Sequence, residues 1–192
     1  MRANYERIRS EVGEGVTVVA ATKYVALDDM RVLADAGVEV VGENRAQELE
    51  RKHAEYGDMF RWHFIGHLQS NKVKVVNGIC ELVHSLDSDS AAARLTIPAL
   101  VEVNLAGEAS KAGILPEDLP RFLELYGEVR GLMTMPPETG DPEASRPYFS
   151  RLRELAEQHG LLELSMGTSQ DYRVAAEEGA TLVRVGSVLY GE

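Results

Sequence analysis

Cysteine is nearly absent from this 192-residue chain, in which Cys80 stands alone. One cysteine cannot form an internal disulfide, and Met1 to Tyr5 read as a charged helix start rather than an apolar signal segment. Long apolar runs are also missing, because the longest are strand-sized and interrupted by Lys, His or Glu. We therefore expect a soluble, cytoplasmic protein without membrane association, in which Cys80 is a small buried hydrophobe.

Basic residues are in the minority, with 20 Lys and Arg against 31 Asp and Glu, a net charge of -11 and a pI near 5.0. This balance argues against nucleic-acid binding, which requires a basic face. It leaves small anionic ligands open, because a few local donors can hold a phosphate on an acidic protein. His63 and His67 lack a recognisable third metal ligand, and His84 fits a core histidine, so we expect no metal site.

Short apolar runs alternate with helix-like segments along the whole chain. The runs, each expected to form a strand, are 16–21, 38–41, 62–65, 82–86, 99–105, 129–133, 162–166 and 182–185. Helical spacing is clearest in 27–37, 119–123, 149–160 and 171–179. Eight such units predict one (β/α)₈ TIM barrel domain over residues 1–192, with an open doubly wound sheet as the alternative. Such barrels typically take about 250 residues, so loops must be short, the longest irregular stretch being 136–147.

Lys23 ends the apolar run 16–23, where a charged side chain requires an explanation. A lysine at this point can simply snorkel into water as a buried strand emerges. In a barrel, however, the carboxyl ends of the strands share one face and carry the chemistry. We therefore treat Lys23 as a candidate site residue, with the snorkelling explanation left open.

Two glycine-hydroxyl segments follow the last two expected strands. Residues 165–171 contain Gly167, Thr168 and Ser169 before a helix, and residues 184–187 contain Gly186 and Ser187. In barrels these two loops frequently form a joint phosphate site. The alternative for the first segment is an ordinary helix cap by Ser169 or Asp171.

Arg184 lies between apolar neighbours in the last expected strand, on the same side as Leu182 and Gly186. Its guanidinium must therefore form an ion pair inside the barrel or meet a ligand. A lysine, a phosphate cradle and a group for a ring nitrogen together suit a Schiff base with pyridoxal 5′-phosphate. An aldolase-like lysine enzyme acting on a sugar remains an alternative.

The chain resembles a known family, the pyridoxal phosphate homeostasis proteins of the YggS/PROSC group. The matching stretches run in order along nearly the whole sequence, and the block 62–72, WHFIGHLQSNK, is the most specific. The others are 20–23, 42–44 with Gln47 and Glu48, 110–114, 130–135, 165–171 and 183–187.

The resemblance implies a barrel like the N-terminal domain of alanine racemase, with Lys23 as the Schiff-base lysine. It also implies the remaining pyridoxal phosphate contacts. Asn44 and Met166 would lie near the ring, Arg184 would face the pyridine nitrogen, and the phosphate would be held by Thr168, Ser169, Gly186 and Ser187. Thr168 departs from the family, which often has Met there, and this affects the detail of the phosphate contacts.

An arginine at the pyridine nitrogen disfavours a protonated ring and weakens it as an electron sink. The alanine racemase fold supplies a second base from an added β domain, whereas only residues 188–192 follow the last strand here. We therefore expect a monomer without strong catalytic activity that holds pyridoxal phosphate for cellular homeostasis and delivers it to apoenzymes. The alternative is a weak pyridoxal-phosphate-dependent amino-acid racemase, with His67 or water as the second base.

Overall fold

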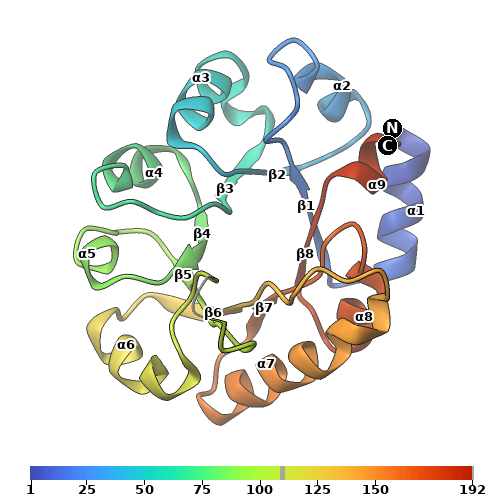
Figure 1. The fold of residues 1–192 in the computed structure, drawn as a ribbon. Helices are drawn as coiled ribbons and strands as arrows, with labels where there is room; N and C mark the ends of the chain where they lie inside the picture. The colour runs from blue at the N-terminus through green and yellow to red at the C-terminus, as the bar shows by residue number, and fades with distance from the viewer. Residues whose placement is uncertain (109–110, 192) are drawn as a thin grey trace.

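A closed barrel of eight parallel strands forms the centre of the computed structural model, which describes residues 1–108 and 111–191. The strands pair in chain order from β1 to β8, and β1 closes the ring against β8 (Figure 1). Their bounds are β1 Thr17–Ala21, β2 Val40–Glu43, β3 Arg61–Phe64, β4 Leu82–Leu86, β5 Ala99–Glu102, β6 Val129–Met133, β7 Glu163–Ser165 and β8 Leu182–Val185. The predicted TIM barrel is confirmed, and the open doubly wound sheet is excluded.

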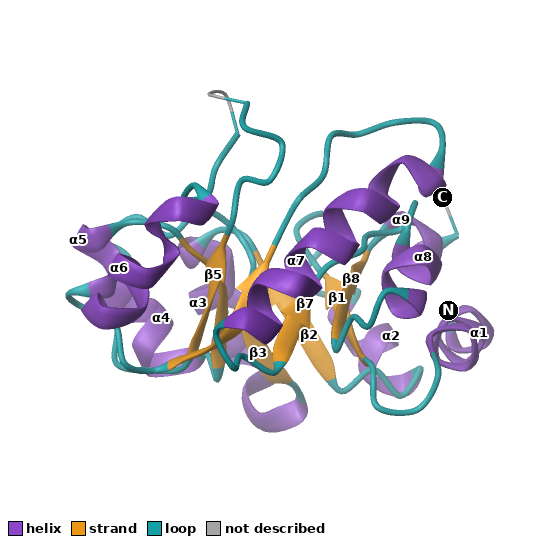
Figure 2. Ribbon diagram, turned by 90° about the horizontal axis from the view of Figure 1, so that it is seen from below, coloured by secondary structure: helices purple, strands orange, loops and turns teal. Residues whose placement is uncertain are grey.

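Helices surround the barrel on its outer side (Figures 1 and 2). The α-helices are α1 Arg2–Val12, α2 Met30–Asp35, α3 Ala46–Tyr56, α4 Val73–Ile79, α5 Asp89–Ala92, α6 Leu119–Leu125, α7 Arg146–Gln158, α8 Tyr172–Glu177 and α9 Ser187–Tyr190. Short 3₁₀ turns lie at η1 Gly57–Met59, η2 Pro116–Asp118 and η3 Pro142–Ser145. Several crossover helices have only four to seven residues, which lets this short chain complete the barrel. No helix in the described ranges is long and apolar enough to cross a membrane.

Apolar side chains form two cores because residues alternate between the two faces of each strand. Val19, Leu100 and Leu182 belong to the small cluster inside the barrel. A much larger cluster lies between the strands and the helices and includes Val18, Phe64 and Val183. Cys80 is buried in this outer core, as expected.

Several strand bounds differ from the expected runs by one or two residues, as in β2, which was expected at 38–41. Three differences bear on the carboxyl-end face of the barrel. Strand β1 ends at Ala21, so Lys23 lies in the turn beyond it rather than at its last position. Strand β5 ends at Glu102, and beyond it Val103 forms an isolated parallel bridge with Ile114. The irregular stretch expected to reach Pro147 is shorter, since η3 and α7 begin before that residue and a proline is tolerated in the first turn of a helix.

Candidate functional site

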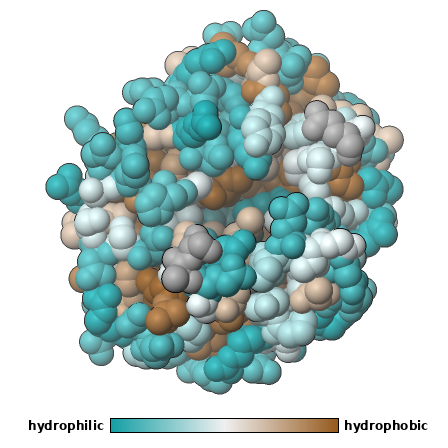
Figure 3. All heavy atoms as spheres, viewed as in Figure 1, coloured by the Kyte–Doolittle hydropathy of each residue, from teal (hydrophilic) through white to brown (hydrophobic). Residues whose placement is uncertain are grey.

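A pocket of about 710 Å³ opens at the carboxyl ends of the strands. Figure 3 shows this face of the molecule, which is hollowed near its centre and bordered by polar side chains. The pocket brings together most of the site residues that the sequence predicted: Lys23, Asn44, Thr168, Ser169, Arg184, Gly186 and Ser187. They come from the segments that follow β1, β2 and β7 and from the end of β8.

Lys23 presents an exposed side chain to this pocket. Its Nζ lies 4.8 Å from the ring centroid of Tyr24, a cation–π distance. The preceding residue, Thr22, is fully buried, and its amide donates to the Gly42 carbonyl at 3.0 Å. A fixed backbone therefore carries an accessible amine at the edge of the pocket.

Asn44 lies on the pocket wall directly after β2. Its backbone N–H donates to Glu43 Oε2 at 3.3 Å. Gly66 approaches it so closely that a Cβ on Gly66 would lie 2.3 Å from the Asn44 carbonyl oxygen. Glycine at position 66 is therefore required by the close approach of two backbones beside the pocket.

Ser169 joins the two glycine-hydroxyl loops. Its Oγ accepts from the amide of Gly186 at 2.9 Å and from that of Val188 at 3.4 Å. Thr168 instead uses both its amide and its hydroxyl to donate to Asp171 Oδ1, at 2.7 and 3.1 Å. Neither Ser169 nor Asp171 makes a side-chain cap to α8 among these contacts, so the simple cap alternative does not describe this loop.

Gly167 has a positive φ of 91°, and a Cβ there would lie 2.5 Å from the Ala175 Cβ. The turn that brings Thr168 and Ser169 to the pocket therefore requires glycine. Ser187 is the first residue of α9, where an amide N–H has no acceptor within the helix. Hydroxyl and amide donors of both loops thus meet on one side of the pocket.

Arg184 points into the barrel, as the strand alternation predicted, and is only 6% exposed. Its Nη1 donates to the Ser165 carbonyl at 2.9 Å and also to Ser165 Oγ, while Nη2 donates to the Thr134 carbonyl at 3.1 Å. Burial lowers the pKa of the guanidinium to about 10, which leaves it charged at neutral pH. It is therefore held by neutral acceptors and not by a direct ion pair among these contacts.

Two predicted residues lie elsewhere. Met166 is fully buried in the outer core and is not among the described residues that line the pocket, because strand alternation turns Ser165 inward instead. His67 is likewise outside the described lining, with Nδ1 3.6 Å from Asp87 Oδ2. His84 is a fully buried histidine hydrogen-bonded to other side chains, as expected.

Several lining residues were missed by sequence reasoning, notably Tyr24, Ile65 and Tyr190. Tyr190 donates its hydroxyl to the Ala21 carbonyl at 2.9 Å, which ties α9 to the end of β1. The spacing of single aromatic residues carries no signal for such a long-range contact. Ile65 follows an alternation that sequence analysis could have used, since it packs with the barrel-interior cluster.

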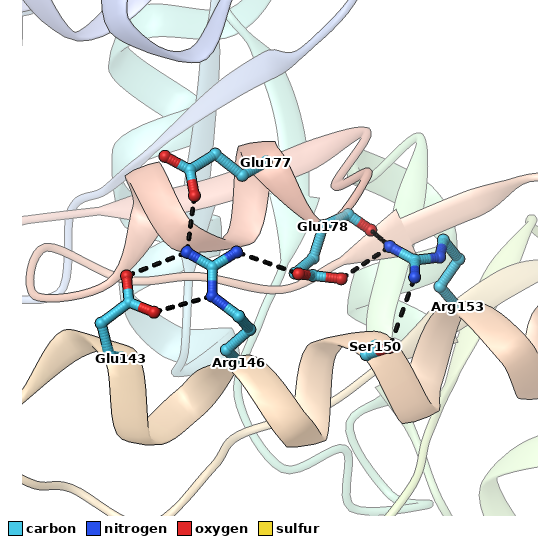
Figure 4. Close-up of polar contacts among 6 residues, drawn as sticks. All are labelled: Glu143, Arg146, Ser150, Arg153, Glu177 and Glu178. Carbon is cyan, nitrogen blue, oxygen red and sulfur yellow. Dashed lines mark hydrogen bonds and ion pairs between the residues drawn. The ribbon is translucent and has the colours of Figure 1, made fainter.

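The segment after β6 also lines the pocket, and in Figure 1 it crosses the barrel face toward α7. Glu138 in this segment accepts from Gln170 Nε2 at 3.3 Å, which joins it to the Ser169 loop. Its far end is anchored by the charged cluster of Figure 4. There Arg146 pairs with Glu143, Glu177 and Glu178, and Arg153 pairs with Glu178.

An eight-stranded parallel barrel with lysine, arginine and hydroxyl groups around one pocket defines a class of fold, and comparison with known proteins identifies the family. The family model described as alanine racemase, N-terminal domain, matches residues 1–192. The pyridoxal phosphate homeostasis protein of Aquifex aeolicus is 42% identical over 196 residues, covering 91% of this chain and 86% of that protein. The protein of the same name from Pseudomonas aeruginosa is 41% identical over 194 residues, covering 92% and 84%.

Solved structures agree with this assignment. PipY of Synechococcus elongatus, solved with pyridoxal phosphate bound, is 33% identical with a TM-score of 0.87 and 99% coverage of both chains. Alanine racemase from Bartonella henselae is 17% identical with a TM-score of 0.78, covers all of this chain and 58% of that one, and shows a shared fold. The chain therefore belongs to the alanine racemase N-terminal domain family and, within it, to the pyridoxal phosphate homeostasis proteins, which confirms the resemblance seen in the sequence. Ser110 of the matching segment 110–114 lies outside the described residues.

Proposed function

We propose that this chain binds pyridoxal 5′-phosphate at Lys23, holds it reversibly and delivers it to apoenzymes, without strong catalytic activity of its own. The observation that carries the proposal is that an exposed lysine amine, a buried guanidinium and a cluster of hydroxyl and amide donors line one pocket. The relatives named for pyridoxal phosphate homeostasis and the ligand-bound structure of PipY support the choice of cofactor.

The donor set fits this cofactor. Ser169 and Ser187 offer hydroxyl groups suited to a phosphate, and Ser187 adds a backbone N–H at the start of α9. In this structure the Gly186 N–H donates to Ser169 Oγ, and the Thr168 N–H and hydroxyl donate to Asp171. Arg184 offers a charged donor in the lining of the pocket and would be the residue that faces a ring nitrogen. Asn44 offers a side-chain amide from the end of β2. When bound, pyridoxal phosphate supplies an aldehyde that can form a Schiff base with the amine of Lys23.

Arg184 also supports holding rather than turnover. A guanidinium is a permanent donor and does not hand a proton to a ring nitrogen, so it keeps the ring a weak electron sink. His67, the second base that a racemase alternative would use, lies outside the described pocket lining. We therefore favour the carrier over the racemase.

Reconstitution with pyridoxal phosphate tests the proposal directly. We expect a yellow protein whose visible band disappears on borohydride treatment, with the cofactor mass fixed to the peptide that contains Lys23. Lys23→Ala should lose the band, whereas Lys74→Ala, which changes an exposed lysine on α4, should keep it. A colourless wild-type protein that takes up no pyridoxal phosphate would refute the assignment.

Delivery is tested with a pyridoxal-phosphate-dependent apoenzyme and an enzymatic trap for cofactor in solution. Activation that persists in the presence of the trap supports direct transfer, and activation abolished by the trap supports release into solution. Sustained racemisation of amino acids that Lys23→Ala removes would replace the carrier with the racemase.

A further inference from the structure

Four polar side chains form a continuous hydrogen-bonded chain across the barrel interior. His63 Nδ1 lies 2.9 Å from His84 Nε2, and His84 Nδ1 lies 2.7 Å from Ser165 Oγ. Ser165 Oγ in turn contacts Arg184 Nη1. The four residues come from β3, β4, β7 and β8, and each is at most 6% exposed. Only Arg184 belongs to the pocket lining, so the other three reach the pocket through it.

The guanidinium of Arg184 determines which group donates in each hydrogen bond of this series. Arginine has donors only, so Ser165 Oγ must accept from Arg184. Ser165 Oγ has no side-chain partner other than Arg184 and His84 among the described residues. If His84 Nδ1 also donated to Ser165, the buried hydroxyl proton would lack an acceptor, at a cost of about 1–3 kcal/mol. The hydroxyl therefore donates to His84 Nδ1.

The two histidine tautomers follow from that direction. With Nδ1 as an acceptor, a neutral His84 carries its proton on Nε2 and donates to His63 Nδ1. A neutral His63 then also carries its proton on Nε2. Burial lowers the pKa of His63 to about 3 and that of His84 well below its usual value, with the charge of Arg184 contributing for His84. Both rings are thus neutral and in the Nε2–H form at neutral pH.

The contacts of Arg184 show what this arrangement does. Nη1 donates to the Ser165 carbonyl and hydroxyl, and Nη2 donates to the Thr134 carbonyl and to Met135 Sδ at 2.9 Å. Four of the five N–H donors are therefore used, which leaves Nε–H without an acceptor among these contacts. A rotation of the guanidinium would exchange this donor for another and would break the contacts to Ser165.

We propose that His63, His84 and Ser165 are positioning residues that hold Arg184 in one orientation, so that a single N–H donor is offered to an acceptor on the bound ligand. The proposal rests on the proposed function for the identity of that ligand, a ring with an acceptor nitrogen. The hydrogen-bonded chain itself exists in the protein without ligand. It can therefore be tested separately.

Nitrogen-15 NMR of the ligand-free wild-type protein tests the direction of the chain. We expect both His63 and His84 as neutral Nε2–H tautomers at pH 7 and still unprotonated at pH 6. We also expect slow rotation of the Arg184 guanidinium. An Nδ1–H tautomer or a protonated ring in either histidine would overturn the proposal, whether or not the protein binds pyridoxal phosphate.

Ser165→Ala removes the central link, and Ser165→Thr restores a hydroxyl. In the ligand-free protein, Ser165→Ala should speed rotation of the Arg184 guanidinium, and Ser165→Thr should slow it again. In the loaded protein, Ser165→Ala should weaken cofactor binding about tenfold, as expected for one lost hydrogen bond to a charged group, and change the pH dependence of the visible band. Borohydride should still fix the cofactor to Lys23.

His84→Phe is the second variant, because it keeps a ring of similar size while removing both nitrogens. It should give the same guanidinium and spectral changes as Ser165→Ala. Unchanged guanidinium rotation and an unchanged band in both variants would show that the chain serves only packing. If the wild type has the expected tautomers and rotation but takes up no cofactor, the proposed function fails while the positioning of Arg184 stands.

Discussion

Lys52 Nζ lies 2.7 Å from the carbonyl oxygen of Thr22, the residue immediately before Lys23. The same ammonium forms an ion pair with Glu43, the residue immediately before Asn44. Thr22 Oγ1 also donates to Glu43 Oε1 at 2.6 Å. A buried cation from α3 thus ties together the two strand ends that carry Lys23 and Asn44.

Removing the charge of Lys52 should lower the stability of the protein. Glu43 is fully buried, so Lys52→Met leaves an uncompensated carboxylate and should lower the free energy of unfolding by about 3–5 kcal/mol. Urea denaturation measures the loss. Lys52→Met/Glu43→Gln, which removes both charges, should recover part of it, and Lys74→Met is the control for a lysine on the surface. Equal stability of the single variant and the control would contradict this account.

Two glycine-to-alanine substitutions distinguish a glycine required by close backbone contact, Gly66, from a glycine in an open helix position, Gly78. Gly66→Ala forces a Cβ to within 2.6 Å of the Asn44 Cα, so the backbone must shift, at a cost of about 1–3 kcal/mol. Pyridoxal phosphate should then bind more weakly, because Asn44 moves. Gly78→Ala on α4 meets no atom within 4 Å and should stabilise the protein by about 0.5–1 kcal/mol. Thermal unfolding and cofactor titration check both variants, and a neutral Gly66→Ala would refute the steric argument.

Glu102 should make stability depend on pH. Burial, and then the nearby charge of Asp87, raise the pKa of Glu102 from 4.5 to about 7. A raised pKa means that the folded state binds the proton more tightly, so this contribution is complete below about pH 4.5 and is lost as pH rises through 7. The loss amounts to about 3 kcal/mol by pH 8.

Glu102→Gln should remove that dependence. Its free energy of unfolding should fall less than that of the wild type between pH 5 and pH 8. Glu124→Gln, on the exposed side of α6, is the matched control for loss of one negative charge and should follow the wild type. If the unfolding free energy of Glu102→Gln and of the wild type changed with pH in the same way, the pH dependence would come from a group other than Glu102.

The charged cluster of Figure 4 gives a surface prediction. Arg146 contacts three carboxylates at 2.6–2.9 Å, with its side chain 34% exposed. We expect Arg146→Met to lower the free energy of unfolding, and to do so by less at high salt, because solvent and ions screen exposed pairs. Arg151→Met, which breaks one exposed pair with Glu154, should cost less than about 0.5 kcal/mol. A loss of unfolding free energy in Arg146→Met that is no larger than in Arg151→Met would show that the network adds nothing to stability.

Much of the fold was predictable because its signals are local. All eight strands lie where short apolar runs occur, since buried parallel strands require such runs. The inward direction of Arg184 also followed from simple alternation. Short helices such as α5 escaped prediction, because four residues cannot display a helical period.

The candidate site was predictable in part. Strand ends and glycine-hydroxyl loops identified Lys23, Ser169 and Ser187, which the structure brings to one pocket. Met166 was carried over from the resemblance, and the structure places it in the outer core. Its neighbour Ser165 turns inward, and the sequence contained no sign of its contacts with His84 and Arg184.

By itself the sequence determined the barrel, the family, and the lysine and phosphate loops, because periodicity and short motifs are properties of neighbouring residues. Only the tertiary structure decided which polar groups meet. Lys52 reaches Thr22 across 30 positions, and His84 reaches Ser165 across 81. Such contacts depend on strand register and helix packing, in which the closing of the ring sets side chains from distant segments at hydrogen-bonding distance. The environment of Lys23 and Arg184 is therefore a product of the closed barrel and not of any one segment.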